Sequence, residues 1–265
     1  MLSEAKKIVF KVGTSTLTHE TGKTNLRAME SLVEVLCDLA NSGKKVALVT
    51  SGAIGMGVGK LGLKSRPTDT AGKQAAATVG QCELMFMYDK MFSQLGHTVG
   101  QLLITKEDVD DEKRRENLIR SFSKLFDYDA IPIINENDAV AVDEIVYGDN
   151  DSLSAVVATL IGADALVILT ETDGLYTANP LTDKTAQRIE SVEKITDEIR
   201  SYASGSGTTL GTGGMTTKLH AAEIATNAGI ETYIVKGSDA RVIYDLIDGK
   251  STGTHFLAQK RGERT

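Results

Sequence analysis

Two lysines stand out as the residues of this sequence best suited to chemistry. Lys11 lies inside the apolar run 7–12, where a charge is unusual, and Lys218 follows the glycine- and threonine-rich segment 211–217 at the start of a predicted helix. A helix start offers free N–H groups and the positive end of the helix dipole, so a lysine there is unfavourable unless an anion is bound. The two lysines therefore predict an anion site. The alternative is that Lys11 extends its ammonium group to solvent and that Lys218 is an ordinary surface residue.

The segment 134–153, INENDAVAVDEIVYGDNDSL, gathers carboxylates between two apolar runs that are expected to enter a core. So many charges beside a core suggest a site that holds a ligand, and the alternative is a solvated loop. The carboxylates are those of Glu136, Asp138, Asp143, Glu144, Asp149 and Asp151.

Apolar periodicity predicts strands and helices that alternate along the chain. The predicted strands are 7–12, 45–50, 98–105, 130–135, 165–170 and 230–237. The predicted helices are 26–39, 73–95, 111–126, 151–162, 216–229 and 240–248. Nearly continuous apolar strands between helices indicate an α/β fold with a mainly parallel sheet covered on both faces, and we expect residues 1–265 to form a single domain.

Two regions fall outside this alternation. The glycine-rich segment 51–62 is expected to be a flexible loop followed by a turn, and residues 139–142 are expected to pair with 144–147 as a hairpin arm. In an open α/β sheet, ligands bind beyond the carboxyl ends of the strands. The loops after the first, second, fourth and fifth predicted strands, which are rich in small and polar residues, all fall at that edge.

Composition excludes several classes of function. The chain of 265 residues carries a net charge of −7 and has a pI of about 5.2, so a nucleic-acid-binding surface is not expected. No run of about 18 apolar residues is present, and the apolar run near the N-terminus is too short for a signal peptide, so no membrane association is expected. Cys37 and Cys82 stand alone, which predicts buried free thiols in a reducing cytoplasm rather than a disulfide or a metal site.

Familiar phosphate-binding motifs do not explain the lysines. A P-loop requires G-x-x-x-x-G-K-[ST], and no segment matches it. A G-x-G-x-x-G match occurs at Gly57, Gly59 and Gly62, but it starts seven residues after its strand and lacks the acidic residue expected about 20 positions later. A dinucleotide-dependent oxidoreductase is therefore an alternative that depends on this match alone.

Six motifs that occur in order give the sequence a resemblance to a known family. They are VFKVGTS, LVTSGAIGMG, PIINENDAV, GDND, LTETDGLYTANP and GTGGMTTK. Together, from Lys7 to about Phe256, they resemble the glutamate-phosphorylating branch of the amino acid kinase family. The resemblance implies a three-layer αβα sandwich that uses ATP and Mg²⁺ to phosphorylate the γ-carboxylate of L-glutamate, the first step of proline biosynthesis. It also implies a cytoplasmic homo-oligomer, a dimer or a tetramer.

The resemblance assigns substrate-binding residues within two of these motifs. Asp138, Asn150 and Ser51 match the family's glutamate-binding positions. A carboxylate such as Asp138 would pair with the α-ammonium of glutamate through a charge-assisted hydrogen bond, and Asp149 is expected to help there. Backbone N–H groups of Ser51, Gly52 and Ala53 would receive a carboxylate of the substrate. Glu136, Asp143 and Glu144, the rest of the acidic run, are expected to be solvated or capping residues.

The reaction implied by the resemblance needs no general base. The γ-carboxylate has a reference pKa of about 4.3 and is already an ionised nucleophile at pH 7, so catalysis must come from positioning and cationic stabilisation. By resemblance, Lys11 and Lys218 stabilise the transferring phosphoryl group, Gly13 adds a backbone N–H, and Asp151 holds the two lysines. Mg²⁺ would be carried by the nucleotide phosphates, without a metal site on the protein. The residues expected to bind the nucleotide are Lys11, Thr170, Glu171, Thr212, Gly213, Gly214, Met215, Thr216, Thr217 and Lys218.

Two departures from the family and two rival functions remain. Glu171 stands where the family usually has Asp, and the chain ends at Thr265, so the C-terminal domain of many members, which resembles RNA-binding modules, is not expected. A kinase of N-acetylglutamate or aspartate is one rival, but an acetylated amine is neutral and would not require Asp138. A non-catalytic amino-acid sensor is the other, and the presence of both lysines argues against it. Proline, which shares the amino-acid head of glutamate, is expected to be a feedback inhibitor.

Overall fold

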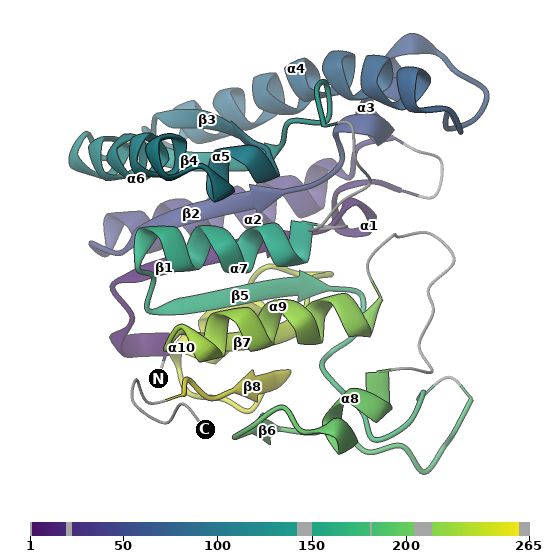
Figure 1. The fold of residues 1–265 in the computed structure, drawn as a ribbon, viewed down its shortest axis with the longest axis vertical. Helices are drawn as coiled ribbons and strands as arrows, with labels where there is room; N and C mark the ends of the chain where they lie inside the picture. The colour runs from purple at the N-terminus through teal and green to yellow at the C-terminus, as the bar shows by residue number, and fades with distance from the viewer. Residues whose placement is uncertain (1, 20–22, 142–149, 181, 204–213, 260–265) are drawn as a thin grey trace. The chain divides into compact units, whose positions relative to one another are not determined.

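The computed structural model describes residues 2–19, 23–141, 150–180, 182–203 and 214–259. The chain folds into two compact units, Met1–Lys11 with Tyr147–Thr265 (the first unit) and Val12–Val146 (the second unit). Strands and helices alternate in each, as Figure 1 shows. Within the described ranges, no helix has the length and apolar character needed to cross a membrane. The single domain over residues 1–265 stays a prediction.

The strands of the first unit lie in the order β1-β5-β7-β8-β6. They are β1 (Lys7–Val12, of which Val12 belongs to the second unit), β5 (Ala165–Thr170), β7 (Glu231–Lys236), β8 (Thr254–Phe256) and β6 (Ser191–Val192). β5 and β7 are parallel, with Thr170 opposite Lys236 at their carboxyl ends, and β8 runs antiparallel to β7 and parallel to β6. The helices are η1 (Leu2–Glu4, a 3₁₀ turn), α7 (Asn150–Ile161), α8 (Asp197–Ala203), α9 (Met215–Asn227) and α10 (Val242–Ile247).

Helices α7 and α9 pack side by side in front of β5 and β7 in Figure 1. Small side chains make this packing possible, because alanines allow two helix backbones to approach closely while still burying apolar surface. The buried alanines are Ala155 and Ala158 on α7 and Ala221, Ala222 and Ala225 on α9. The starts of both helices are therefore held close to each other by their packed backbones.

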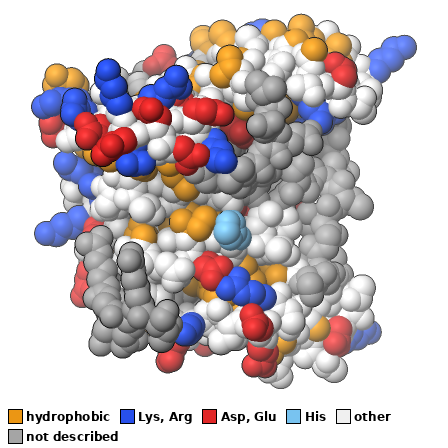
Figure 2. Space-filling view, in the orientation of Figure 1, with side chains coloured by type: hydrophobic (Ala, Val, Ile, Leu, Met, Phe, Trp, Pro, Cys, Tyr) orange, Lys and Arg blue, Asp and Glu red, His pale blue; other side chains and the backbone are white. Residues whose placement is uncertain are grey.

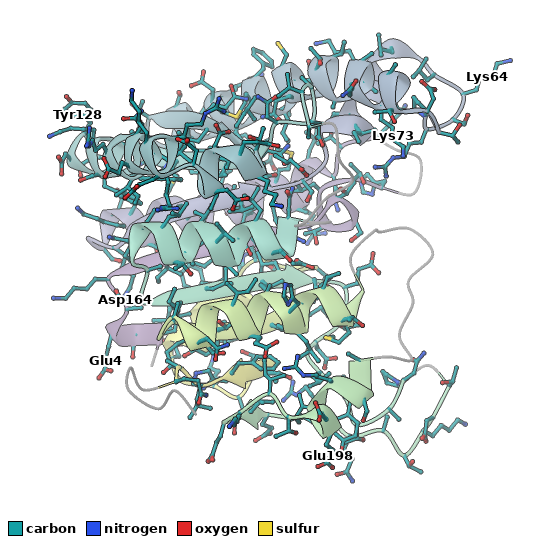
Figure 3. All side chains as sticks on the ribbon, in the orientation of Figure 1. Glu4, Lys64, Lys73, Tyr128, Asp164 and Glu198 are labelled. Atoms are coloured by element: carbon teal, nitrogen blue, oxygen red, sulfur yellow. The ribbon has the colours of Figure 1, made fainter. Side chains whose placement is uncertain are left out.

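Asp164 fixes the beginning of β1. Its Oδ2 accepts hydrogen bonds from the backbone N–H groups of Lys6 and Lys7, each at 2.8 Å, and its own N–H donates to the carbonyl of Lys7. Figure 3 shows Asp164 at the amino end of β5, beside the start of β1. Strand β1 thus enters the first unit in a fixed register, with residues 8–11 buried.

The second unit contains three parallel strands in the order β3-β4-β2. They are β3 (Val99–Ile104), β4 (Ile131–Glu136) and β2 (Lys45–Thr50), and Leu48 and Val49 lie opposite Ile133 and Ile134. The helices are α1 (Thr14–Leu17), α2 (Leu26–Asn41), α3 (Ala53–Leu61), α4 (Thr70–Gln94), α5 (Lys106–Asp110) and α6 (Glu112–Asp127). In Figure 1, α6 lies in front of these strands and α2 lies behind them, so helices cover both faces.

Helix α6 presents a charged face to solvent. Figure 2 shows Lys and Arg side chains gathered beside Asp and Glu side chains over α5 and α6. Exposed ion pairs join Arg114 to Asp108 and Arg120 to Glu116, whereas Phe122 is buried beneath them. Exposed pairs of this kind add little to stability, so α6 is held in place by its apolar face.

The predicted α/β class with mainly parallel strands is confirmed, and each predicted strand and helix is present within a few residues of its expected bounds. Short elements escaped prediction, among them α1, α8, β6 and β8. Of the two cysteines, Cys37 is buried as expected, but the prediction is wrong for Cys82, which is exposed on α4; both are free thiols. The hairpin expected over 139–142 and 144–147 falls largely outside the described residues.

The glycine-rich segment 51–62 was expected to be a loop, and this prediction is wrong. It forms helix α3, which packs tightly on α4, and the glycines are needed for that packing. A Cβ atom on Gly57 would lie 1.8 Å from the carbonyl oxygen of Ala76, and one on Gly80 would lie 1.7 Å from that of Ala53. The close approach of two backbones therefore outweighs the low helix propensity of glycine, and it accounts for Gly57 without a dinucleotide.

We predict that Gly80→Ala destabilises the protein by about 1–3 kcal/mol or more, because the new methyl group would overlap the Ala53 backbone and α3 would have to move. Gly55→Ala, on the facing helix, is the matched control. Its Cβ would make an ordinary contact of 3.8 Å with Thr14, and alanine is favoured over glycine in a helix by about 1 kcal/mol. Urea unfolding followed by circular dichroism measures both. Equal midpoints for the two variants would contradict the packing argument.

Candidate active site

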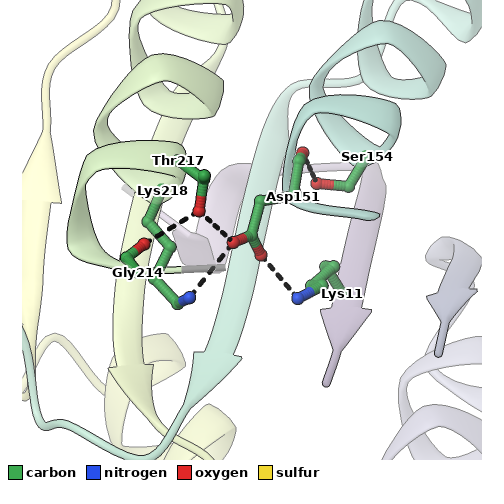
Figure 4. Close-up of polar contacts among 6 residues, drawn as sticks. All are labelled: Lys11, Asp151, Ser154, Gly214, Thr217 and Lys218. Atoms are coloured by element: carbon green, nitrogen blue, oxygen red, sulfur yellow. Dashed lines mark hydrogen bonds and ion pairs between the residues drawn. The ribbon is translucent and has the colours of Figure 1, made fainter. Parts of the chain in front are cut away.

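Asp151 is completely buried between the two lysines that the sequence singles out (Figure 4). Its Oδ1 lies 2.6 Å from Nζ of Lys11, and its Oδ2 accepts a hydrogen bond of 3.1 Å from Nζ of Lys218. Only 6% of Lys11 and 7% of Lys218 is exposed, against 0% of Asp151. Neither lysine is therefore an ordinary surface residue, and the alternative of a solvent-extended Lys11 is wrong.

Three elements of the first unit bring these side chains together. Lys11 comes from β1, Asp151 from the first turn of α7, and Lys218 from the first turn of α9. A carboxylate in the first turn of a helix is stabilised by the helix dipole, and Ser154 Oγ closes that turn by donating to the carbonyl oxygen of Asp151 at 2.5 Å. The alanine packing of α7 on α9 then sets the separation of the two helix starts.

The lysines decide the protonation of Asp151. Burial alone would raise the pKa of its carboxyl group, but the positive charges and hydrogen bonds of Lys11 and Lys218 outweigh burial and hold the pKa below its usual range. The carboxylate is therefore ionised at neutral pH. With both lysines protonated, the cluster carries one surplus positive charge in a poorly hydrated setting, and such a charge favours an anionic ligand.

The start of α9 adds further groups suited to an anion. Gly214 is its N-cap residue and makes no side-chain cap bond, and the first N–H groups of a helix have no partner within it. Thr217 Oγ1 lies 3.1 Å from Asp151 Oδ2 and 2.8 Å from the carbonyl oxygen of Gly214. Met215 is buried and Thr216 is exposed. The turn that carries Lys218 thus combines backbone donors with a cation, as phosphate sites do.

The carboxyl ends of β5 and β7 form the edge beside these groups in the first unit. Thr170 is the last residue of β5, and its carbonyl oxygen accepts a hydrogen bond of 2.7 Å from the N–H of Gly237. Glu171 follows it and is exposed. Both lie where an open parallel sheet binds its ligands.

In the second unit, the loop after β2 leads directly into α3. Gly52 is the N-cap residue of α3 and has φ +107°, a conformation that glycine adopts without strain. The N–H of Ser51 donates to the carbonyl of Val12, so that N–H is not available to a substrate, contrary to the prediction. The N–H groups of Gly52 and Ala53, at the start of a nine-residue helix, remain suited to a carboxylate.

Asp138 lies just beyond β4 in the second unit and is half-buried. Burial raises the pKa of its carboxyl group, and the charge of Arg66 offsets this in part. Among the residues that the structure describes, none forms a hydrogen bond or an ion pair with this carboxylate. A partly desolvated carboxylate without such a partner would gain from a cationic ligand. Earlier on the strand, Asn135 is buried and donates to Gln81 Oε1 of α4 at 2.8 Å.

Comparison with known proteins identifies the family. Residues 6–236 match the model of the amino acid kinase family. The chain belongs to the amino acid kinase family. Among the relatives of this kinase, the glutamate 5-kinase of Clostridium tetani is 54% identical over 98% of this chain and 97% of its own length. The glutamate 5-kinase of Moorella thermoacetica is 50% identical over 100% of this chain and 70% of its own length.

Solved structures support the predicted fold of this amino acid kinase. The UMP kinase of Bacillus anthracis matches with a TM-score of 0.65 at 14% identity, over 96% of this chain and 97% of that one. The isopentenyl phosphate kinase of T. acidophilum matches with a TM-score of 0.65 at 16% identity, over 94% and 99%. At such identities the likeness shows the fold alone. The predicted three-layer αβα architecture is thereby confirmed.

The structure of this kinase brings some of the predicted residues together within the first unit, and others belong to the second unit or lie outside the described residues. Lys11, Asp151 and Lys218 meet in the first unit, where Asn150 begins α7 next to Asp151. Gly13, the N-cap of α1, belongs to the second unit with Asp138 and the 51–53 loop. The predicted residues that lie outside the described residues are Asp149, Thr212 and Gly213. Nowhere in the described part of the chain do three or more His, Cys, Asp or Glu side chains come together as metal ligands.

Sequence reasoning missed three contributors to these sites. Thr217 was expected at the nucleotide only, but its hydroxyl reaches Asp151. Gln81, which holds Asn135, lies on a helix whose sequence gives no sign of that contact. Gly80 shapes the start of α3 from α4, and the small residues at 76, 77 and 80 were a signal that could have indicated close helix packing.

We predict that Asp151→Asn lowers stability by about 3–5 kcal/mol at pH 7, because two buried ammonium groups lose their counter-charge. The pKa of Asp151 is lowered by folding, so its contribution is present above the unfolded pKa of about 3.9 and is lost as the pH falls through the lower folded-state value. The stability difference between wild type and variant should therefore shrink in that acidic window.

Urea unfolding at pH 7 and at a series of lower pH values measures this difference. Asp110→Asn is the control, because the Asp110 carboxylate is exposed and its ion pair with Lys106 spans 3.8 Å. That variant should resemble the wild type at every pH. A loss for Asp151→Asn that is the same at pH 7 and below pH 3 would contradict the assignment of a buried, ionised carboxylate.

Proposed function

We propose that this protein catalyses the ATP-dependent phosphorylation of the γ-carboxylate of L-glutamate to L-glutamyl 5-phosphate, the first step of proline biosynthesis. The observation that carries the proposal is the buried Asp151 carboxylate held between Lys11 and Lys218. The relatives of this chain with 46–54% identity that are named glutamate 5-kinase support the substrate.

The transfer step follows from the charges of the reacting groups. An oxygen of the ionised γ-carboxylate attacks the γ-phosphorus of ATP, a P–O bond to that oxygen forms, and the bond from the γ-phosphorus to the β,γ-bridging oxygen breaks, which leaves ADP. No proton has to be removed from the nucleophile. Repulsion between two anions is the main obstacle, and Lys11 and Lys218 would offset it by stabilising the negative charge of the transferring group. Gly13 would add a backbone N–H.

The first unit offers residues that fit a nucleotide. The surplus positive charge beside Asp151 and the uncapped start of α9 suit phosphates, with Gly214, Met215, Thr216 and Thr217 as the backbone donors. Thr170 and Glu171 would lie under the rest of the nucleotide at the end of β5, and Thr212 and Gly213 remain part of this proposal. Mg²⁺, when bound to the phosphates, would supply further charge neutralisation and keep several water ligands.

The second unit offers residues that fit the amino-acid head of glutamate. Asp138 would pair with the α-ammonium, and the N–H groups of Gly52 and Ala53 would receive a carboxylate, with the side chain of Ser51 beside them. Asn150, which belongs to the first unit, and Asp149 remain part of this proposal. The desolvation that raises the pKa of Asp138 favours a substrate with a free ammonium group over N-acetylglutamate, whose amide is neutral.

An assay of acyl phosphate formation separates this function from its rivals. ATP is incubated with glutamate, N-acetylglutamate or aspartate, and hydroxylamine traps the acyl phosphate as a hydroxamate. We expect a hydroxamate with glutamate. Product only with N-acetylglutamate or aspartate would point to a related carboxylate kinase, and binding of glutamate without turnover would point to a sensor. A homo-oligomer, a dimer or a tetramer, and a cytoplasmic location stay predictions.

We predict that Lys11→Ala and Lys218→Ala each lower kcat by about 10²-fold or more, because a cationic donor to the transferring group is lost. Each change also removes a buried ion pair, so circular dichroism must first show that the variant is folded. Lys250→Ala, at an exposed ion pair with Asp245, is the control and should keep the activity of the wild type. Activity of a lysine variant within threefold of wild type would remove that lysine from the mechanism.

We predict that Asp138→Asn raises KM for glutamate by about tenfold or more and leaves KM for ATP nearly unchanged, because only glutamate brings an ammonium group.

Proline carries the same carboxylate and a positively charged ring amine, so we propose that it inhibits by occupying this site. Its inhibition should be relieved by excess glutamate and weakened in the same variant. A selective rise in KM for ATP would place Asp138 at the nucleotide, and proline inhibition that persists at saturating glutamate would place proline elsewhere.

A further inference from the structure

Thr217 stands between two acceptors at the start of α9, and only one of them belongs to its own helix. Its Oγ1 lies 2.8 Å from the carbonyl oxygen of Gly214, which is the local bond that helical threonines commonly make. It also lies 3.1 Å from Oδ2 of Asp151 on α7. A hydroxyl group has one proton, so these two acceptors share or exchange it.

The contact with Asp151 makes the two carboxylate oxygens unequal. Among the described residues, Oδ1 faces Lys11 alone, whereas Oδ2 receives both Lys218 and Thr217, two consecutive residues of one helix turn (Figure 4). Rotation of the carboxylate about its own axis would exchange the oxygens and alter both lysine contacts. A third donor on one side opposes that rotation because it adds a directional hydrogen bond to a buried charged group.

We propose that Thr217 is a positioning residue whose hydroxyl group orients the Asp151 carboxylate, and through it the ammonium groups of Lys11 and Lys218. This inference rests on the proposed function, in which those ammonium groups stabilise the transferring phosphoryl group. It gives Thr217 a role distinct from the nucleotide contact that the resemblance implies. The role needs the hydroxyl group and no contact between that group and ATP.

The three possible roles of Thr217 differ in what they affect. A positioning residue affects the rate of the chemical step, since small displacements of a catalytic group cost much in rate and little in ground-state binding. A nucleotide ligand affects the affinity for ATP. A residue needed only for folding affects stability and leaves the kinetics of the folded protein unchanged.

Two substitutions and one control test the proposal. Thr217→Val keeps the shape and removes the hydroxyl, and Thr217→Ser restores the hydroxyl without the methyl group. Thr226→Val is the matched control, because Thr226 is a buried threonine of the same helix whose hydroxyl donates to Glu223 within that helix at 3.4 Å. For each protein, kcat and both KM values are measured by hydroxamate formation, and the Kd for ATP is measured by calorimetry.

We expect Thr217→Val to lower kcat by about tenfold or more, with the Kd for ATP changed less than threefold. Thr217→Ser should recover most of the rate, and Thr226→Val should behave as the wild type. A loss of ATP affinity that matches the loss of rate would overturn the proposal in favour of a nucleotide ligand. Wild-type kinetics for folded Thr217→Val would overturn it outright.

A second measurement separates this inference from the proposed function. The Asp151 carboxyl carbon is titrated by ¹³C NMR in the wild type and the three variants. The charged groups that face it among the described residues are Lys11 of β1 and Lys218 of α9, and both are unchanged. Loss of a donor to the carboxylate should raise its pKa in Thr217→Val alone. A raised pKa in Thr217→Val together with an inactive wild type would refute the proposed function and retain the hydrogen bond that orients Asp151. An active wild type with the same Asp151 pKa in Thr217→Val would refute the positioning role of Thr217.

Discussion

The first unit depends on one interaction, the burial of the Asp151 carboxylate between two ammonium groups. Taking these charges out of water costs several kcal/mol for each ion, and only close contacts from Lys11 and Lys218 offset that cost. The contacts exist only if β1, α7 and α9 keep their relative positions to within a few tenths of an ångström. The buried charges thus require precise placement of these three elements. The hydrogen bonds from β1 to Asp164 and the alanine packing of α7 on α9 provide that placement.

Small residues satisfy the same demand for precise helix placement in both units. In the first unit, alanines let α7 and α9 approach, so that the first turn of α9 presents Thr217 and Lys218 to Asp151 in the first turn of α7. In the second unit, Gly57 and Gly80 allow α3 to lie against the backbone of α4. The start of α3 is where the N–H groups of Gly52 and Ala53 lie. Close packing of backbones leaves few alternative positions for the helix starts, and it therefore fixes where their polar groups lie.

Much of this arrangement could be predicted from the sequence, and the failures have physical reasons. The strands and long helices follow from apolar periodicity, and a lysine inside an apolar strand indicated an anion site at Lys11. Helix α3 could not be recognised from the sequence, because its glycines are needed for close packing against the backbone of α4, which comes later in the chain. The hydrogen bond from Ser51 N–H to Val12 and the direction of the Thr217 hydroxyl depend on tertiary register, which no local pattern encodes.

The balance of two positive charges and one negative charge explains why the cluster consists of two lysines and one aspartate. Two lysines without Asp151 would be like charges in a buried setting, with no counter-charge to offset the cost of their burial. Two carboxylates beside two lysines would cancel the charge and leave nothing to attract an anion. One carboxylate gives both ammonium groups a counter-charge and still leaves one positive charge in surplus. The negative charge of Asp151 therefore helps to build an anion site, because it offsets the cost of burying two ammonium groups. Asp151 is completely buried, so it does not compete with a ligand for the sides of Lys11 and Lys218 that face away from it.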